Sequence, residues 1–557
     1  LLVFSMEHIF EQQPIPALRH TDRMKHLVTT LLLAIGWPFA HAGATEAGDP
    51  ARGQAIHLEG RLPDGSRLRA RRTDLPDMTG PAAACAQCHR RSGMGDQEGR
   101  LRVPPITAAS LLAPGRTAAV GRAAPGIEIA GTRTERRPAY TADSFARALR
   151  TGVDPAGGVL APWMPRYALD DAAVADLFAW LERLGPVGGA SLRGLVDHTL
   201  HLATIVTPDA PAARREAVET TLSAWARQQR FGDVRVALHV WRLTGDAAGW
   251  TAQLQQRLAE QPVYAVVSGA GAAQWTPVEA FCEAASLPCV FPLVDAAPAP
   301  PPAGRHHALY LSEGLSAEAR VAARAVAALG TVPARVQVWF DSDAGHGAAQ
   351  VFQSALAAGS PDVQLRDLRV QPIAAGQPLG AANELVVAWL PTPQVQALLA
   401  PPAALRQADA LPAVWLSGQL APAEALDLAP AWRARVRWAS LRSTPERWRA
   451  TAVTSLQPWL RTLGLDPLQA TPLQGEVYAA AYFFTDALQR SRGAWSVEHV
   501  LERLEAGVNN RAAAGTYLRL SLGQGQRVAA QVGQIQGWAP PDHRTLVPMS
   551  PVLNANR

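Results

Sequence analysis

The four cysteines of this 557-residue chain fall into two close pairs, and the first pair belongs to the motif that most constrains the fold. Residues 85–89 read Cys-Ala-Gln-Cys-His. Two thiols three positions apart on one helical turn can both form thioethers with haem vinyl groups, while the adjacent histidine ligates the iron. A zinc ribbon would need a second C-x-x-C, and a thioredoxin-like redox pair would not need the histidine. The motif therefore predicts one covalent haem c on Cys85, Cys88 and His89.

The composition excludes several broad classes of protein. Apolar residues make up 48% of the chain and charged residues 18%, so the chain is not a disordered polyelectrolyte and has the material for large buried cores. The net charge of +5 is small for this length, and the basic residues are not clustered with interleaved aromatic residues. We therefore expect no nucleic-acid partner.

The segment before the motif resembles an export signal. Met24 and Lys25 begin a short basic start, an apolar stretch follows from Leu27 to Phe39, and Ala40-His41-Ala42 has the A-x-A form of a cleavage site. We interpret residues 24–42 as a signal peptide and residues 1–23 as an upstream extension. The alternative, a membrane anchor, is disfavoured because the apolar stretch is shorter than the ~20 residues that span a bilayer. The expected product is a soluble, exported protein of the periplasm.

The second axial ligand of the haem iron is expected downstream of the motif. Met78 precedes the attachment site, and Met94 follows His89 by only five residues, which is too close to reach the opposite haem face. Met164 lies in the segment Pro162-Trp163-Met164-Pro165, where flanking prolines can hold a thioether in place. We predict Met164 as the ligand; the alternative is an ordinary core methionine.

Helix signals flank this methionine loop. Thr141 is a suitable N-cap and Gly152 a suitable stop for one helix. Asp170 or Asp171 can cap a second helix, in which apolar residues recur at three- and four-residue steps as far as Leu184. The order is therefore C-x-x-C-H helix, long irregular loop, helix, methionine loop and closing helix.

With this order of elements, residues 50–186 resemble a class I cytochrome c. The resemblance implies an all-α domain in which Cys85 and Cys88 carry the haem, His89 is the proximal ligand and Met164 the distal ligand. Ligation on both sides leaves the iron no open position and raises its potential. This implies an electron carrier, not an enzyme.

Two weaker features lie near the predicted haem. Pro104-Pro105 stands where the haem-edge loop of the family runs. Arginines are also dense here, which predicts either a solvated face with haem-propionate partners or a docking face for an acidic redox partner. These arginines are Arg67, Arg69, Arg71, Arg72, Arg90, Arg91, Arg100 and Arg102.

A cluster of chain breakers, Gly185-Pro186-Val187-Gly188-Gly189, marks the boundary of a second region, residues 196–545. Apolar runs alternate there with helical patterns, and continuous apolar runs indicate parallel strands that are covered on both faces. The expected strands are Leu200–Val206, Val234–Trp241, Val263–Ser268, a short strand from Cys289, Ala308–Leu311, Val336–Phe340, Leu385–Trp389 and Ala413–Leu416.

Helices are expected between these strands. The clearest are Asp209 to about Arg230, Trp250–Glu260, a helix with a capping box at Thr276–Glu279, and Ser316–Leu329. A proline-rich crossover at Pro298–Pro302 divides the pattern into two series, which predicts two doubly wound α/β lobes.

The second region resembles type I periplasmic ligand-binding proteins, the Leu/Ile/Val-binding-like branch of ABC-transporter substrate-binding proteins. The residues that carry the likeness are Val263–Gly269 with Leu287-Pro288-Cys289, Val336–Asp343 leading to Gly345, and the helix Tyr478–Phe484. The resemblance implies a ligand cleft between the lobes, at the carboxyl ends of the strands.

Cys282 and Cys289 form the second cysteine pair. They join the end of a helix to the start of the next strand, and a tight turn can bring their Cα atoms within the ~4.4–6.8 Å that a disulfide requires. In an oxidising compartment we expect a disulfide; the alternative is a reactive thiol pair.

Candidate cleft residues follow from the strand ends, although a scaffold role is favoured for each of them over a ligand contact. The loop after the third strand reads Ala270-Gly271-Ala272-Ala273, where amino-acid binders of the family offer hydroxyl groups, so the pocket could be degenerate. The candidates are Ser268, Gln274, Trp275, Asp341, Ser342 and Ser417.

The fusion of these two regions leads to two hypotheses. The leading one is a periplasmic electron-transfer protein whose second region binds a small molecule or docks a dehydrogenase, as in quinoprotein alcohol-dehydrogenase systems, and passes electrons on to a terminal acceptor. The alternative is a solute receptor of an ABC-type uptake or sensing system, with the haem as a redox gauge. The chain has no second C-x-x-C-H and no G-x-G-x-x-G, so an independent oxidoreductase is the weakest reading.

Overall fold

The computed structural model describes residues 48–72, 76–98, 101–124, 127–185, 192–298, 306–331, 333–359, 368–374, 379–400, 411–509 and 515–555. The predicted upstream extension and signal peptide lie outside these ranges, as does all of the predicted breaker cluster except Gly185. Among the described residues, no helix is long and apolar enough to cross a membrane. We call residues 48–185 the N-terminal part and residues 192–555 the two-lobed part.

The N-terminal part is mixed in secondary structure, so the predicted all-α domain is not what the structure shows. Its helices are α1 (Pro50–Glu59), α2 (Ala86–His89), α3 (Ala108–Leu111), α4 (Ala142–Thr151) and α5 (Asp171–Leu181). A small antiparallel sheet has the order β2 (Met78–Thr79), β1 (Arg69–Arg71), β7 (Arg166–Tyr167). Two hairpins pair β3 (Asp96–Glu98) with β4 (Leu101–Val103) and β5 (Gly115–Ala124) with β6 (Ile127–Arg137), in place of the expected irregular loop.

The predicted caps Thr141 and Asp170 and the predicted stop at Gly152 are confirmed, whereas α5 ends at Leu181, before Leu184. The Thr141 hydroxyl accepts a hydrogen bond from the backbone N–H of Ser144 in a capping box, and α4 ends at Gly152, which has φ of 76°. The carboxylate of Asp170 accepts the backbone N–H of Ala173 at the start of α5. These caps satisfy backbone N–H groups that have no partner within the helix.

Helices α1 and α5 cross at a glycine. A Cβ at Gly53 would lie 2.0 Å from the carbonyl oxygen of Asp176, so the two backbones approach more closely than a larger residue allows. Beside this point, the buried carboxylate of Asp176 lies 2.9 Å from the Arg52 guanidinium. The indole N–H of Trp180 donates to His57 Nδ1 at 2.9 Å. The crossing therefore closes the core of the N-terminal part.

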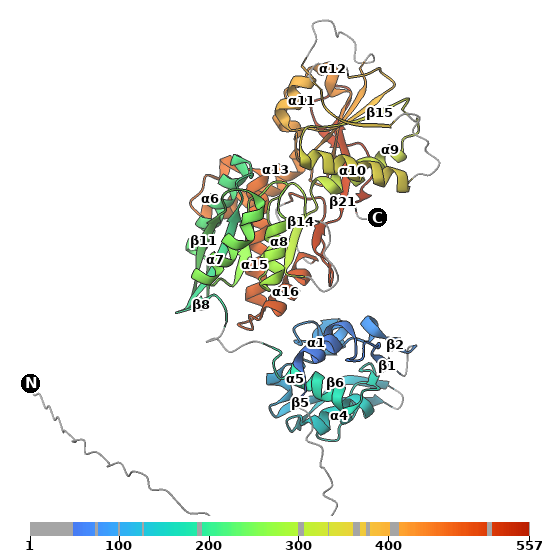
Figure 1. The fold of residues 1–557 in the computed structure, drawn as a ribbon, viewed down its shortest axis with the longest axis vertical. Coiled ribbons are helices and arrows are strands. Elements are labelled where there is room, and N and C mark those ends of the chain that lie inside the picture. Colours follow the sequence, from blue (N-terminus) through green and yellow to red (C-terminus); the bar gives the residue numbers. More distant parts are fainter. Residues whose placement is uncertain are drawn as a thin grey trace, which may run out of the picture. The chain divides into compact units, whose positions relative to one another are not determined.

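The first lobe is built on a sheet with the order β10-β11-β9-β12-β13-β14-β20, in which β10 is antiparallel. Figure 1 shows β11 and β14 of this sheet together with the helices of the lobe. Helices α6, α15 and α16 pack on one face of this sheet and α7 and α8 on the other. The strands are β8 (Leu195–Val196), β9 (Thr199–Val206), β10 (Arg230–Phe231), β11 (Val234–Arg242), β12 (Ala265–Val267), β13 (Cys289–Val290), β14 (Ala308–Ser312) and β20 (Val528–Ala530). The helices are α6 (Ala212–Gln228), α7 (Trp250–Glu260), α8 (Thr276–Ala284), α15 (Pro472–Arg490) and α16 (Val497–Asn509).

The second lobe has a sheet of order β16-β15-β17-β18-β19-β21-β22, parallel from β16 to β19. Helices α9 and α10 cover one face, and the segment with α11 and α12 covers the other. The strands are β15 (Val336–Phe340), β16 (Leu368–Pro372), β17 (Leu385–Trp389), β18 (Ala413–Ser417), β19 (Val436–Ser440), β21 (Val532–Trp538), β22 (Leu546–Pro548) and β23 (Leu553–Asn554). The helices are α9 (Leu315–Ala327), α10 (Asp343–Gly359), α11 (Thr392–Leu398) and α12 (Pro430–Arg433).

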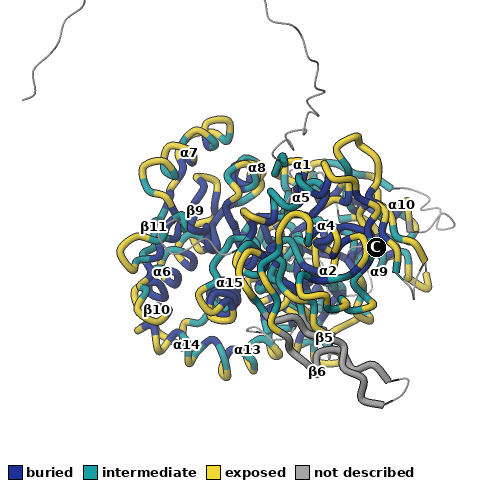
Figure 2. The backbone as a smooth tube through the Cα atoms, turned by 90° about the horizontal axis from the view of Figure 1, so that it is seen from below, coloured by how far each residue is buried: buried dark blue, intermediate teal, exposed yellow. Residues whose placement is uncertain are grey.

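Burial follows from these layers. Strand β9 is almost entirely buried, whereas helices such as α7 alternate between buried and exposed residues (Figure 2). Within β15, Val338 packs on the side of α9 and α10, and its neighbour Trp339 packs in the core on the opposite face. Continuous apolar strands are therefore explained by two covered faces, as predicted.

The path between the lobes differs from the prediction. Strand β14 does not begin the second lobe; it pairs with β13 and β20 in the first. Within the described residues, the chain crosses after β14, returns after β19 through α13 (Pro445–Thr454) and α14 (Leu456–Thr462) to α15, and crosses again between β20 and β21. Strand periodicity alone does not report which sheet a strand joins, so the first crossover was predicted one strand too early.

The capping box predicted at Thr276–Glu279 is also wrong. Helix α8 begins at Thr276 without a side-chain cap. The Glu279 carboxylate instead accepts the hydroxyl of Tyr310 at 2.6 Å and lies 2.8 Å from the Arg527 guanidinium. Glu279 therefore bonds to buried residues from other segments and does not cap the helix as the local pattern predicted.

Candidate haem site and inter-lobe cleft

The C-x-x-C-H motif forms a single helical turn. Cys85 is the N-cap residue of α2, and the helix runs from Ala86 to His89. Cys85 and His89 are buried, whereas Cys88 is exposed. Both thiols are free, so they are available for two thioethers on one turn.

His89 is held by one ring nitrogen. Its Nδ1 lies 2.9 Å from the carbonyl oxygen of Pro104, which accepts the Nδ1–H. This bond leaves the Nε2 lone pair for a ligand, and a carbonyl partner of this kind is typical of metal-ligating histidines. Burial lowers the pKa of His89, which favours the neutral imidazole that metal ligation needs.

Two glycines bring the Pro104 carbonyl to His89. The backbone N–H of Gly95 donates to the carbonyl of His89 at 3.0 Å, and Ile106 N–H donates to Gly93 at 2.7 Å. Gly95 has φ of 72°, and a Cβ there would lie 2.2 Å from the Val103 carbonyl oxygen. Only glycine fits this approach without displacing the segment that carries Pro104.

Met164 and Met78 both pack, half-buried, against the same apolar core, which includes Cys85 and Tyr167. They belong to one neighbourhood because Ala70 of β1 pairs with Met78 on one side and with Tyr167 of β7 on the other. Met164 as distal ligand therefore stays a prediction, and Met78 is the alternative that the fold adds.

The arginines near the motif divide into two groups. Arg90 pairs with Asp96, and Arg91 lies 2.9 Å from Glu505 of α16, so these two are already neutralised within the chain. Arg67, Arg69, Arg71 and Arg102 are exposed, Arg72 is half-buried, and the side chain of Arg100 lies outside the described residues. The exposed arginines Arg67, Arg69, Arg71 and Arg102 are therefore the ones that stay candidates for a docking face.

The disulfide predicted between Cys282 and Cys289 is present. The two Cα atoms are 6.2 Å apart, and the bond joins the end of α8 to β13. Both residues are buried in the core under α7 and α8.

The six predicted cleft residues do not form one cluster. Trp275 is a core residue that packs on Gly269 and Gly271, and Gln274 is exposed. Ser268 is buried, and its hydroxyl has no hydrogen-bond partner among the described residues.

The candidates of the second lobe have structural partners. Ser342 is exposed, and its hydroxyl accepts the N–H of Gly345 near the start of α10; Asp341 beside it is also exposed. Ser417 is fully buried and donates to the Glu318 carboxylate. As ligand contacts, all six candidates stay predictions.

Other polar groups at the strand ends satisfy one another. Arg214 of α6 is buried; it donates to the carbonyl of Gly271 and lies 2.9 Å from the Asp295 carboxylate. From the second lobe, the Gln419 side-chain amide donates to the carbonyls of Val294 at 3.2 Å and Asp295 at 3.0 Å. Arg214 therefore hydrogen-bonds to the backbone of the Ala270–Ala273 loop, and Gln419 forms hydrogen bonds between the two lobes.

A cavity that sequence reasoning missed lies where the second lobe meets the returning helices. Its polar lining includes Ser440, Arg442, Ser443, Trp448, Thr516 and Gln536. Among the described residues, Trp448 Nε1 and Thr516 Oγ1 are buried without hydrogen-bond partners, and Arg442 is held 2.6 Å from Glu476. No local pattern marks these residues, because they come from segments that meet only in the folded chain.

Residues 81–185 match the family model for cytochrome c. The N-terminal part therefore contains a cytochrome c domain, and this family carries haem. The buried His89 with its Pro104 partner and the two free thiols fit that group. The number of haems and their covalent attachment stay predictions.

Solved structures similar to the chain are type I periplasmic binding proteins. A periplasmic binding protein type 1 from Bordetella pertussis Tohama I is 11% identical, with a TM-score of 0.46, and covers 63% of this chain and 100% of its own. A branched-chain amino acid ABC transporter protein from Thermus thermophilus with bound valine is 13% identical, with a TM-score of 0.47, and covers 64% and 96%. A substrate-binding periplasmic protein from Ralstonia solanacearum is 13% identical, with a TM-score of 0.47, and covers 63% and 99%. No curated protein matches the chain.

Proposed function

We propose that this protein is an exported electron carrier of the periplasm, and that its two-lobed part docks a redox partner. The observation that carries the proposal is the hydrogen bond from His89 Nδ1 to the Pro104 carbonyl within a C-x-x-C-H turn. This bond would leave the other imidazole nitrogen to ligate the iron of a haem held by Cys85 and Cys88. The haem supplies one-electron chemistry when it is bound.

The choice of carrier over enzyme depends on the distal ligand. If a methionine side chain bound the iron together with His89, no open position would be left, which would disfavour chemistry on oxygen or peroxide and raise the potential. Met164 is the proposed ligand, since its loop packs on the same core as Cys85. Export is supported by the disulfide in the two-lobed part, because disulfides persist in oxidising compartments.

Two measurements test the haem. The pyridine haemochrome spectrum and intact mass of the purified protein should show one covalent haem per chain, with residues 1–42 removed. A chain without covalent haem would overturn the proposal.

The distal ligand is tested by a matched pair of variants. Met164→Ala should abolish the long-wavelength absorption of methionine-ligated ferric haem and lower the potential, while Met78→Ala keeps both. The reverse result would transfer the role to Met78, and no effect in either variant would reject methionine ligation.

A docking role for the two-lobed part is supported by its internally paired strand ends. Arg214, Asp295 and Gln419 satisfy one another across the region where the family's cleft would lie. A redox partner of this kind would be a periplasmic dehydrogenase, for example a quinoprotein, that delivers electrons to the haem.

A second candidate function is a receptor for a small polar solute. The observation that favours it is the cavity with the unpaired Trp448 indole N–H and Thr516 hydroxyl, because such buried groups are normally hydrogen-bonded. A thermal-shift screen against amino acids, alcohols and carboxylic acids tests it, since a ligand at 100 times its Kd stabilises the folded state by about 2.7 kcal/mol. A shift that Trp448→Phe removes would establish the receptor function; no shift with any compound favours docking.

A further inference from the structure

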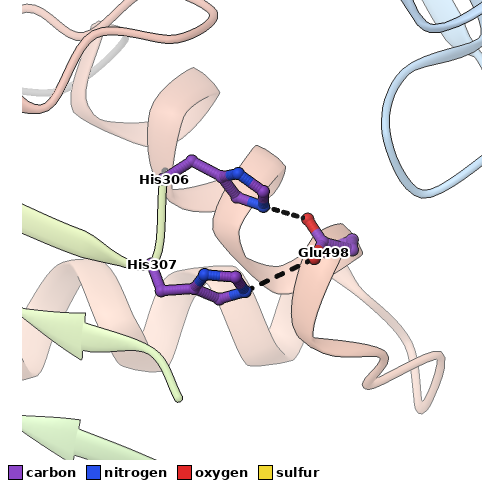
Figure 3. A group of neighbouring side chains, drawn as sticks. All are labelled: His306, His307 and Glu498. Atoms are coloured by element: carbon purple, nitrogen blue, oxygen red, sulfur yellow. Dashed lines mark hydrogen bonds and ion pairs between the residues drawn. The ribbon is translucent and has the colours of Figure 1, made fainter. Parts of the chain in front are cut away.

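Two consecutive histidines and a distant glutamate meet in the first lobe. His306 and His307 precede β14, and Glu498 lies near the start of α16 (Figure 3). His306 Nε2 is 2.8 Å from Glu498 Oε2, and His307 Nε2 is 3.6 Å from Glu498 Oε1. All three potential ligand atoms lie within 4.8 Å of one another. Both imidazole rings therefore direct the same nitrogen at one carboxylate.

His307 is oriented by a second carboxylate. Glu283, at the end of α8, accepts the Nδ1–H of His307 at 3.1 Å and the backbone N–H groups of His306, His307 and Ala308. This arrangement places a proton on Nδ1, and Nε2 is the ring nitrogen that faces the Glu498 carboxylate. A carboxylate behind a histidine in this way is typical of metal sites, where it fixes the tautomer.

The Nε2 atom of His307 lacks a hydrogen bond. His307 is 7% exposed, and its Nε2 is buried without a hydrogen-bond partner among the described residues. The 3.6 Å to Glu498 is too long for a hydrogen bond, and a buried polar atom without a partner is costly. A bound cation would satisfy this nitrogen and the carboxylate together.

The surrounding charges are mixed. The Arg91 guanidinium lies 3.5 Å from Glu498 Oε2, and its positive charge opposes a cation. Arg91 is itself paired with Glu505 at 2.9 Å, and Glu502 lies on the same helix. Glu283 adds a further carboxylate from the other side. Acidic groups therefore outnumber the guanidinium around the two histidines.

We propose that His306, His307 and Glu498 bind a divalent transition-metal ion of the zinc class, with the fourth coordination position open. Imidazole nitrogen with carboxylate oxygen is a donor set that suits zinc. Tetrahedral bonds of ~2.0–2.2 Å separate ligand atoms by about 3.3–3.6 Å. The two nitrogens lie 2.8 and 3.6 Å from different oxygens of the Glu498 carboxylate, and the three potential ligand atoms lie within 4.8 Å of one another, so the side chains must move together to complete the site.

The experiment measures zinc in the full holoprotein. Protein stripped with a chelator is dialysed against low micromolar Zn²⁺, and zinc and iron are counted per chain by mass spectrometry. Wild type should retain one zinc. Glu498→Gln and His306→Gln should weaken zinc binding at least tenfold while the haem spectrum and far-UV circular dichroism stay unchanged.

The control is a second histidine–carboxylate pair. His198 Nδ1 lies 2.6 Å from Asp233 Oδ2 on an exposed surface of the same lobe. Asp233→Asn removes a carboxylate just as Glu498→Gln does and should leave zinc binding at the wild-type level. Equal zinc retention by Glu498→Gln and wild type would overturn the proposal, as would a wild type that retains none.

X-ray absorption at the zinc edge keeps the test decisive if a variant fails to fold. The haem iron does not contribute at this edge. Two imidazole nitrogens in the first shell of wild type are the expected result; a shell of oxygens only would show surface binding and reject the site.

Discussion

The N-terminal part and the two-lobed part use their buried polar groups in opposite ways. His89 donates the N–H of one ring nitrogen, Nδ1, to the Pro104 carbonyl, which leaves the other nitrogen, Nε2, to bind a ligand. At the strand ends of the two-lobed part, Arg214 pairs with Asp295, and Ser417 pairs with Glu318. The haem turn therefore leaves one buried ring nitrogen for a ligand, whereas these two pairs at the strand ends are satisfied within the chain. Elsewhere in the two-lobed part, buried polar atoms in the side chains of Ser268, Trp448 and Thr516 have no hydrogen-bond partner among the described residues. The difference teaches that the haem turn can be assigned from its own residues, whereas the strand ends of the two-lobed part do not by themselves identify a ligand.

The largest test of this contrast is His89→Ala. Because the Nδ1–H of His89 is bonded to the Pro104 carbonyl and its Nε2 is left for the iron, loss of His89 should abolish the low-spin haem spectrum. The thermal unfolding of the two-lobed part should not change. Absorption spectroscopy and differential scanning calorimetry measure the two effects, with His239→Ala as control. A low-spin spectrum that survives would mean that another residue ligates the iron.

Removing the disulfide tests the same comparison by a change in the two-lobed part. Replacing Cys282 and Cys289 together by alanine should destabilise the two-lobed part by roughly 2–3 kcal/mol, because a closed loop of this size restricts the unfolded chain. The haem spectrum should stay unchanged. Calorimetry measures the shift in Tm, and a change of the haem band instead would show that the two parts unfold as one unit.

Glu318→Gln probes the internally satisfied network. Burial raises the pKa of Glu318 to about 7, against the hydrogen bond from Ser417 and the charge of Arg442, which lower it. The folded state therefore binds a proton that the unfolded state releases between its ordinary pKa and about pH 7. Stability from this group is present at low pH and falls as pH rises towards 7.

The glutamine variant should remove that dependence. The Tm of the variant relative to wild type should increase from pH 5 to pH 8. At the higher pH, wild type must either bury the charge of Glu318 or bind a proton from a solution that holds few, whereas the glutamine side chain does neither. Thermal melts across this range measure the difference. A constant difference would show that Glu318 keeps the same charge throughout.

The smallest expected effect is on electron-transfer rate. Reversing two exposed arginines, Arg67→Glu with Arg69→Glu, should slow reduction of ferricyanide, an anionic oxidant, a few-fold at low salt. The difference should vanish at high salt, where such charges are screened. Arg230→Glu with Arg235→Glu changes the net charge equally on the two-lobed part and should leave the rate near wild type. Equal slowing by both pairs would reject a local docking face.

Much of the fold was predictable because local signals carry it. The caps Thr141 and Asp170, the apolar run Val336–Phe340 and the spacing of Cys282 and Cys289 each describe interactions within a few residues or one element. The all-α prediction failed because the paired segments β5 and β6 lie in a stretch without strong strand periodicity.

The candidate sites were predictable to different degrees. The haem turn is contiguous, so its pattern predicts Cys85, Cys88 and His89, and the resemblance to class I cytochrome c places Pro104-Pro105 near the haem. Arg214, Trp448 and Glu498 could not be named, because their partners come from segments far apart in the chain.

The sequence by itself determined the haem-binding turn, the alternation of strands and helices and the disulfide, since each depends on neighbours along the chain. Only the tertiary structure decided that β14 belongs to the first lobe, that Met78 shares a core with Met164, and that His306 and His307 meet Glu498. Those outcomes depend on the packing of whole sheets and helices, in which many weak contacts add up. A short sequence pattern does not contain the information about these many distant contacts.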